Sequence, residues 1–324
     1  MKTSLEAYPV IGFAGMAKNT GKTTTLNHVI QLFSGQVALT SIGLDGESID
    51  QLTGLPKPAI DTVAGMVIAT ARSTLSAATA TVTVLEETPF QTALGPVCIV
   101  RVRRAGTVCV AGPTTNRDLQ SVIEHLQAYH PHVLIDGALE RRTFAGIKSM
   151  SGMVLATGAA VSPDMAETIK KPAHVERLFA LPTFSDLPRW PAEMRLAYHD
   201  AEGDLVWLKK DYRVLTTIKD RLIRGGTLYV RGAITSRLTS FLRDHRLGGF
   251  NIVAEDATKY TLSLQEFAVF DHLGVSAYVT RRCPLLAITL NPWSPTGHHY
   301  EAAHFYTAAV TALKTPVYNV LERT

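Results

Sequence analysis

The stretch from Tyr8 to Phe33, YPVIGFAGMAKNTGKTTTLNHVIQLF, constrains the fold more than any other part of this chain. Residues 8–14 are mostly apolar and predict a short buried strand. Residues 22–33 predict a helix, because apolar side chains recur there at helical spacing: Leu26, Val29, Ile30 and Phe33. A strand, a glycine-containing loop and a helix in this order direct backbone N–H groups and the positive end of the helix toward one point, where an anion can bind.

The end of this loop, Gly21-Lys22-Thr23, matches the second half of the phosphate-loop motif G-x-x-x-x-G-K-[ST]. In that motif the lysine reaches the β- and γ-phosphates and the next hydroxyl residue ligates Mg²⁺. The first glycine is absent, because Met16 holds its position and Gly15 lies one residue too early. The alternative is a polar helix start that binds no ligand. We expect seven residues to bind the phosphates of a nucleotide: Lys18, Asn19, Thr20, Gly21, Lys22, Thr23 and Thr24.

Two acids follow predicted strands and complete the expected site. The run HVLIDG places Asp136 at the carboxyl end of an apolar strand, the position of a Walker-B acid near Mg²⁺. Asp45 follows the strand expected at residues 37–43, and its position resembles the second-strand acid of MinD-like ATPases, dethiobiotin synthetase and MobB-type proteins. In that subclass the acid contacts Mg²⁺ or orients the attacking water. Plain Asp-Gly turns are the alternative for both acids.

These residues predict a catalytic set of Lys22, Asp45 and Asp136 and a Mg²⁺ site formed by Thr23, Asp45 and Asp136. No N-K-x-D or T-K-x-D motif for guanine occurs in the expected region, which favours ATP as the nucleotide. MinD-like ATPases also carry a lysine that reaches a neighbour's nucleotide. Theirs lies five residues before the loop lysine, whereas Lys18 lies four before Lys22, so a role across subunits and a homo-oligomeric state stay open.

Three other positively charged side chains of the predicted first domain each have two interpretations. Lys57 lies between two prolines, which favour extended backbone, and it either contacts phosphate or substrate or faces solvent. Arg141 and Arg142 follow the Walker-B-like acid and either stabilise transferred phosphoryl charge or face solvent.

The order of predicted elements indicates an α/β chain with two domains. Strands and helices alternate along both halves, which predicts mainly parallel sheets. Three prolines, Pro182, Pro188 and Pro191, fall close together where the pattern changes. We therefore expect a P-loop NTPase domain over residues 1–182 and a smaller, Rossmann-like α/β domain over residues 183–324 that binds a partner or ligand.

Two local expectations accompany this division. The run VCIVRVRRAGTVCVAG predicts a β-hairpin with its turn at Ala105-Gly106. In the second domain, the loops after three strands are candidates for one shared ligand or partner site, with turn formation as the alternative: Gly232, Glu255 with Asp256, and the run LNPWSPTGHHY.

Composition and charge narrow the class of protein further. The chain has 324 residues with 46% hydrophobic and 19% charged residues, a balance that supports a sizeable core. The formal net charge of +4 is small, and no block of Lys or Arg occurs, so we expect no nucleic-acid partner. Neither a secretory signal nor a stretch of about 18 apolar residues is present, so we expect a cytoplasmic protein without a membrane span. Cys98, Cys109 and Cys283 predict buried, reduced thiols.

Several stretches together resemble one family, the P-loop subunit of the lysine 5,6-aminomutase reactivase. The resemblance runs in order over nearly the whole chain, and these stretches carry it: GMAKNTGKTTTLNHVI, TSIGLDGES, GLPKPAI, TPFQTALGPVCIVRV, VCVAGPTTN, VLIDGALERRTFA, LATGAAVSPDM, AITLNPWSPTG and TPVYNVL.

The resemblance implies a function and partners. Lysine 5,6-aminomutase depends on adenosylcobalamin and on pyridoxal phosphate, and its radical chemistry sometimes leaves a damaged cobalamin in the enzyme. The reactivase subunit, paired with a MutS-like ATPase, uses ATP to release that damaged cofactor. We therefore expect an ATPase that acts as a reactivating chaperone in lysine degradation. The D-x-H-x-x-G pattern of base-off cobalamin proteins is absent from this chain.

Two other readings fit the same motif. One is a ligase similar to dethiobiotin synthetase, which activates a carboxylate with ATP and needs a small-molecule pocket beside Lys18, Lys22 and Lys57. The other is a MobB-like adaptor, which binds a nucleotide and a partner with little turnover. An apolar patch rimmed by aromatic residues on the second domain favours the readings that require a partner.

Overall fold

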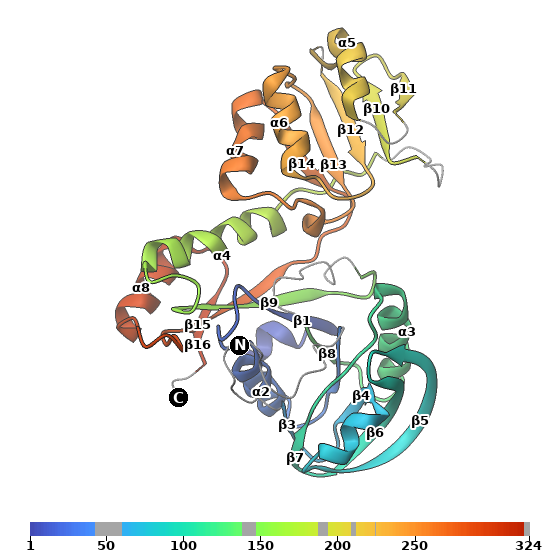
Figure 1. The fold of residues 1–324 in the computed structure, drawn as a ribbon, viewed down its shortest axis with the longest axis vertical. Helices are drawn as coiled ribbons and strands as arrows, with labels where there is room; N and C mark the ends of the chain where they lie inside the picture. Colours follow the sequence, from blue (N-terminus) through green and yellow to red (C-terminus); the bar gives the residue numbers. More distant parts are fainter. Residues whose placement is uncertain (43–59, 138–146, 187–193, 209–211, 224, 321–324) are drawn as a thin grey trace. The chain divides into compact units, whose positions relative to one another are not determined.

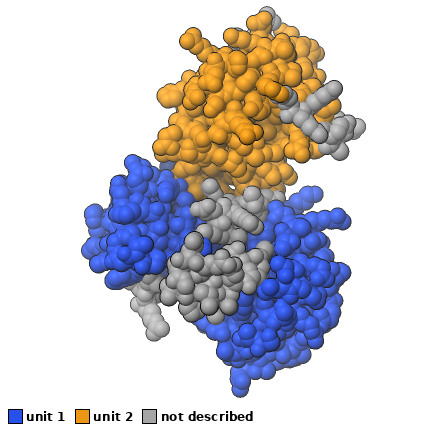
Figure 2. Space-filling model, viewed as in Figure 1, with its two compact units in different colours: residues 1–173, 284–324 blue, residues 174–283 orange. Residues whose placement is uncertain are grey.

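The computed structural model describes most of the chain and divides it into two compact units. It describes residues 1–42, 60–137, 147–186, 194–208, 212–223 and 225–320. The first unit comprises residues 1–173 and 284–324, and the second comprises residues 174–283 (Figures 1 and 2). Each unit is described by itself below.

A nine-stranded, mostly parallel sheet forms the first unit, in the order β16-β15-β9-β1-β8-β2-β4-β6-β5 (Figure 1). All neighbours from β16 to β4 are parallel, and β6 and β5 add to one edge in the antiparallel sense. Its strands are β1 (Val10–Gly15), β2 (Ala38–Ser41), β4 (Val67–Ala71), β5 (Thr81–Thr92), β6 (Gly95–Arg104), β8 (Val133–Asp136), β9 (Gly152–Gly158), β15 (Leu285–Asn291) and β16 (Val317–Asn319).

Helices cover this sheet and bury its apolar side chains. The predicted helix after the first strand is α2 (Lys22–Leu32), and its buried Leu26, Val29 and Ile30 pack in one core cluster with side chains of β1, β2 and β8. On the other face α3 (Asn116–Gln127) packs against β2, β4 and β8 (Figure 1). Thr115 caps α3 by accepting from the Asp118 amide. The unit also contains α1 (Lys2–Leu5), η1 (Arg72–Ala77), α4 (Met165–Phe179) and α8 (Ala302–Ala312).

The antiparallel edge differs from the predicted hairpin. Strand β6 runs through Arg104 and pairs with β4 on one side and β5 on the other, so the hairpin is β5–β6 with its turn at Ala93-Leu94. The predicted turn at Ala105-Gly106 is wrong, because the chain after Arg104 pairs elsewhere. There β7 (Gly106–Val108) joins β3 (Ile60–Thr62) in a separate two-stranded sheet.

A smaller α/β sheet forms the second unit, with the strand order β11-β10-β12-β13-β14. Strands β12 to β14 are parallel, and β10 and β11 extend the sheet in the antiparallel sense. Its elements are β10 (Leu196–Asp200), β11 (Leu205–Trp207), η3 (Tyr212–Ile218), α5 (Lys219–Ile223), β12 (Gly226–Val230), α6 (Ser236–Asp244), β13 (Asn251–Ala254), η4 (Ala257–Lys259), α7 (Leu264–Leu273) and β14 (Ser276–Val279). Helix α7 begins with a capping box in which Ser263 and Glu266 satisfy each other's amides.

The predicted α/β class with mainly parallel sheets is confirmed, but the compact units divide the chain differently from the predicted domains. Residues 284–324 belong to the first unit, because β15 pairs with β9 and β16 pairs with β15. The chain leaves the first unit within α4 and returns to it at residue 284. The second unit is therefore inserted between two parts of the first one.

Two further observations concern the whole of the described chain. No helix among the described residues is long and apolar enough to cross a membrane. Cys98 and Cys283 are buried as expected, and burial raises the pKa of the Cys283 thiol to about 12. The expectation of a buried thiol is wrong for Cys109, which is exposed between β7 and the segment that leads to α3.

Candidate functional site

The carboxyl ends of four parallel strands bring the predicted site together. Strands β8, β1, β9 and β15 are consecutive neighbours, so their carboxyl ends share one edge of the sheet (Figure 1). Strand β2, which follows β1 and α2 in the chain, lies on the β8 side of β1 in the sheet. Strands β9 and β15 lie on the opposite side of β1. This reversal of direction is a topological switch point, and ligands of open α/β sheets bind outside the strand ends at such points.

The β1–α2 loop has the backbone conformation that an anion site requires. Gly21 has φ +87° and Asn19 has φ +62°, both in the left-handed region, where glycine and asparagine are tolerated best. The first hydrogen bond of α2 runs from the Thr25 amide to the Gly21 carbonyl at 2.8 Å. The amides of Lys22 and Thr23 precede it and have no intrahelical acceptor, since helices leave their first N–H groups unpaired.

Two contacts hold the loop in this conformation. The Met16 amide donates to Ala156 of β9 at 2.9 Å. The buried Thr20 hydroxyl donates to the Ala17 carbonyl, also at 2.9 Å. The Thr20 side chain therefore stabilises the loop itself, whereas the side chains of Asn19 and Thr24 are exposed. Lys18 also lies in the loop with its side chain partly exposed.

Lys22 and Asp136 meet at the centre of this edge. The Lys22 ammonium donates to Asp136 Oδ1, and the two side chains are 19% and 20% exposed. Strand register explains the contact, because Asp136 pairs with Phe13 of β1 on one side and with Ser41 of β2 on the other. The structure thus joins two of the three predicted catalytic residues, which lie 114 positions apart in the sequence.

Thr23 and Asp136 carry oxygen atoms of the kind that bind a hard divalent cation, and a phosphate ligand would supply further oxygens to the same ion. Thr23 lies in the first turn of α2, next to Lys22, with its side chain partly exposed. Among the described residues, no group of three or more His, Cys, Asp or Glu side chains is placed to hold a metal ion. One carboxylate and one hydroxyl form no complete cage. They fit Mg²⁺, which commonly takes one or two carboxylates together with waters and substrate phosphates.

Asn291, at the end of β15, also belongs to this site, although the expected domain division placed it in the second domain. Its side-chain Nδ2 donates to the Asn19 carbonyl at 2.9 Å, and a Cβ atom on Gly21 would lie 3.3 Å from the Asn291 Cβ. Two residues earlier, the Thr289 hydroxyl lies 2.7 Å from that of Thr25 in α2. Asparagine after an apolar strand was visible in the sequence, but nothing local showed that the strand lies beside β9.

Gly158 makes the close approach of β9 and β15 possible at this point. A Cβ atom there would lie 2.0 Å from the Asn291 carbonyl oxygen, which also accepts from the Ala159 amide at 2.9 Å. We expect Gly158→Ala to lower the free energy of unfolding by about 3 kcal/mol, because backbone must move to relieve the overlap. Urea titration measures this change.

A matched control separates the steric clash from the general effect of replacing glycine. Gly203 has φ +98° and open space around its Cβ position, so Gly203→Ala should cost only about 1 kcal/mol. Equal losses in the two variants would contradict the importance of the contact between Gly158 and Asn291.

Four residues that the sequence analysis singled out lie outside the described residues. They are Asp45, Lys57, Arg141 and Arg142. The predicted metal and water roles of Asp45 therefore stay predictions, as do the two readings of each cation. The described part of the site consists of the β1–α2 loop, Lys22, Thr23, Asp136 and Asn291.

Two of the three predicted loops, at Gly232 and at Glu255 with Asp256, follow strand ends of the second unit. Strands β12, β13 and β14 are parallel, so Gly232, Asp256 and Arg281 follow strand ends on the same side. Asp256 caps η4 by accepting from the Thr258 amide, and its other oxygen lies 3.6 Å from an Arg281 nitrogen. Helix capping thus accounts for one oxygen of Asp256, and the third predicted loop, LNPWSPTGHHY, belongs to the first unit.

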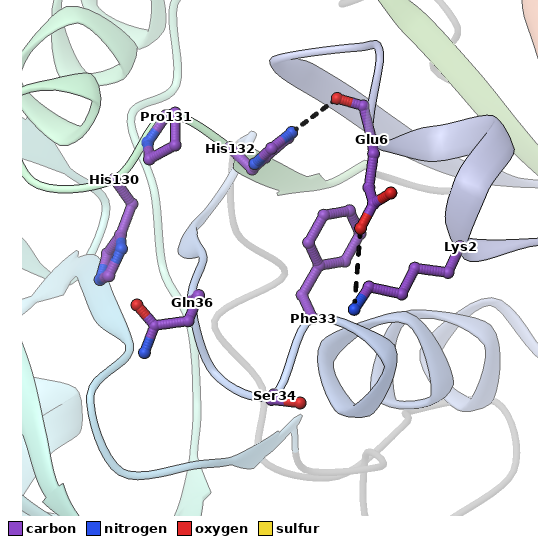
Figure 3. Close-up of a pocket in the computed structure, with 8 residues that line it drawn as sticks. All are labelled: Lys2, Glu6, Phe33, Ser34, Gln36, His130, Pro131 and His132. Carbon is purple, nitrogen blue, oxygen red and sulfur yellow. Dashed lines mark hydrogen bonds and ion pairs between the residues drawn. The ribbon is translucent and has the colours of Figure 1, made fainter.

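An open hollow of about 480 Å³ lies elsewhere in the first unit (Figure 3). Its lining includes Phe33, Gln36 and His132, and the last two residues lie just before the amino ends of β2 and β8, which begin at Ala38 and Val133. His132 Nε2 donates to the Glu6 carbonyl at 3.0 Å, as the dashed line in Figure 3 shows. The hollow is thus at the amino edge of the sheet, opposite the β1–α2 loop, and is no part of the site above.

Comparison with protein-family models, with curated proteins and with solved structures gives no match to this chain. The geometry of the carboxyl edge and the sequence motifs are therefore the basis for a function.

Proposed function

We propose that this chain is a P-loop ATPase that binds Mg·ATP at the β1–α2 loop and hydrolyses it. The observation that carries the proposal is the contact between Lys22 and Asp136. It brings the lysine of the phosphate-loop motif and the acid at the end of β8 to one point on the carboxyl edge. A motif lysine and a strand-end acid that lay apart in the fold would not support this chemistry.

Each residue has a role that follows from its donor or acceptor groups. The unpaired amides at the start of α2 and the Lys22 ammonium supply donors and positive charge for phosphate oxygens. Thr23 and Asp136 would hold Mg²⁺, and Asp45 is proposed as the second acid of the metal and water site. Bound Mg²⁺ neutralises phosphate charge. Lys22 and the amides position the terminal phosphoryl group for attack by water.

We further propose that hydrolysis drives reactivation of an adenosylcobalamin-dependent lysine 5,6-aminomutase, together with a MutS-like ATPase partner. The resemblance of the sequence stretches to the reactivase subunit is the basis for these partners. Chain connectivity supports coupling between the proposed nucleotide site and the second unit. Strand β15 follows directly after the second unit and ends at Asn291, which contacts the β1–α2 loop. A change in the conformation of the β1–α2 loop would thus be passed through Asn291 and β15 to the chain that leads into residues 174–283.

Steady-state hydrolysis of ATP with Mg²⁺ tests the proposal. It is measured for the chain alone, and then with a cobalamin-inactivated lysine 5,6-aminomutase and the MutS-like partner. We expect hydrolysis to rise with the partners, and mutase activity to return when adenosylcobalamin is added. The same assay with Lys22→Ala serves as the control. Binding of ATP without stimulation or recovery would contradict the reactivase proposal and leave the nucleotide site standing.

A further inference from the structure

The loop after β15, residues 291–300, begins in contact with the proposed phosphate site. Asn291 binds the Asn19 carbonyl with its Nδ2 atom, and its Oδ1 accepts from the Trp293 amide at 3.1 Å. One side chain therefore connects the β1–α2 loop to the backbone that carries Trp293. A ligand bound at the β1–α2 loop would therefore lie close to the first residues of the 291–300 loop.

Hydrogen bonds give the 291–300 loop a defined shape. Its two arms pair through the Tyr300 amide, which donates to Pro292 at 2.9 Å, and the Ser294 amide, which donates to His298 at 3.1 Å. The loop is also fastened to the segment after β9, where His298 Nε2 donates to the Ala159 carbonyl at 2.7 Å. These contacts hold Trp293 on a fixed backbone.

The indole of Trp293 is stacked on one face and open to solvent overall. It lies on the His299 imidazole with ring centroids 4.9 Å apart and an interplanar angle of 25°. At 60% exposure it is the most exposed large hydrophobic side chain among the described residues. An exposed aromatic side chain contributes little to a core and leaves apolar ring surface available to a planar ligand.

We propose that the purine base of the nucleotide stacks on the exposed face of Trp293. This inference rests on the proposed function, because a nucleotide whose phosphates lie on the β1–α2 loop carries its base one ribose away from them. A planar base needs one flat surface, and stacking on an aromatic side chain is tolerant of which base is bound. His299 supports the indole from behind and fixes its orientation.

The surroundings of Trp293 favour a base over a protein partner. Its neighbours along the loop are Pro292, Ser294, Pro295 and Thr296, which are small or polar. A protein interface relies on a cluster of packed apolar anchors with a rim that excludes water. The Trp293 indole, stacked on His299, offers a flat surface of the size of a single base.

Binding of two ligands tests the proposal and separates it from the phosphate site. ATP and tripolyphosphate are titrated, each with Mg²⁺, into the wild-type chain and into Trp293→Ala. Loss of one stacking partner should weaken ATP binding about tenfold. Tripolyphosphate has no base, so its affinity should change less than about twofold by the same reasoning. Trp293→Phe should restore most of the ATP affinity, because it keeps an aromatic face.

Tyr306→Ala is the matched control, since it removes an exposed aromatic side chain on α8, outside the loop. It should leave both affinities unchanged. Unchanged ATP affinity in Trp293→Ala would overturn the stacking proposal, and so would an equal loss for both ligands, which would indicate a structural role. If the wild-type chain binds neither ligand, the proposed function itself fails, and the stacking inference with it.

Discussion

Lys22→Ala should lose triphosphate binding by a factor of about one hundred or more, because a charged hydrogen-bond donor to phosphate contributes up to about 3 kcal/mol. The variant should still fold. Lys22 and Asp136 are each about one-fifth exposed, so breaking their pair should cost about 1 to 2 kcal/mol, between the values for exposed and buried pairs. Titration calorimetry with Mg·ATP measures the affinity, and thermal melting checks the fold.

The control is Lys170→Ala, which removes the same side chain from another lysine–acid pair of the first unit. Lys170 donates to Glu167 within α4 and on its exposed surface, whereas Lys22 joins the start of α2 to the end of β8. We expect the Lys170→Ala variant to bind Mg·ATP with the affinity of the wild-type chain. An unchanged affinity in Lys22→Ala, with a normal melting curve, would remove the basis for the nucleotide site.

Asp136→Asn should reduce the rate of ATP hydrolysis about a hundredfold while ATP binding weakens far less, since metal-based stabilisation of phosphoryl charge supplies several kcal/mol. The substitution keeps the shape of the side chain and an oxygen that can accept from Lys22, so the contact between β8 and α2 persists. It removes the negative charge that Asp136 would contribute to the proposed Mg²⁺ site. We expect saturation with Mg²⁺ to need higher concentrations, which a titration of the rate against Mg²⁺ measures.

A second carboxylate in an ion pair provides the comparison for this variant. Asp271 accepts from Arg177 at 2.7 Å in the second unit and is about half exposed. Asp271→Asn should therefore leave the hydrolysis rate and its Mg²⁺ dependence unchanged. A normal rate in Asp136→Asn would mean that Asp136 serves only as a structural partner of Lys22.

The parts of the fold that local patterns control were predictable from the sequence. The apolar run at residues 8–14, the glycine loop and the periodic residues of α2 predicted β1, the loop and the helix in their observed order. The apolar run ending at Asp136 predicted β8 and its acid at the carboxyl end. That these strands are neighbours follows from α/β topology rather than from either pattern alone.

Long-range pairing was not predictable in the same way. An apolar run indicates a strand without showing which strand lies beside it, so β15 was assigned to the second domain although it pairs with β9. For the same reason Asn291 was not recognised as a neighbour of the β1–α2 loop. The prediction of a turn at Ala105-Gly106 was wrong, because glycine also occurs where one strand ends and the chain pairs with a different strand. Here β6 ends at Arg104, and β7 then pairs with β3.

Equilibrium binding of Mg·ATP to the wild-type chain, measured by titration calorimetry, tests the central claim most directly. The proposed site predicts saturable binding of one nucleotide per chain, with a dissociation constant in the range of about 1 μM to 1 mM that is usual for enzyme substrates. Binding should weaken when Mg²⁺ is removed with a chelator, because Thr23 and Asp136 would then lack the ion that links them to the phosphates. The absence of saturable heat up to about 5 mM ATP, well above that range, would contradict the nucleotide site and the functions built on it.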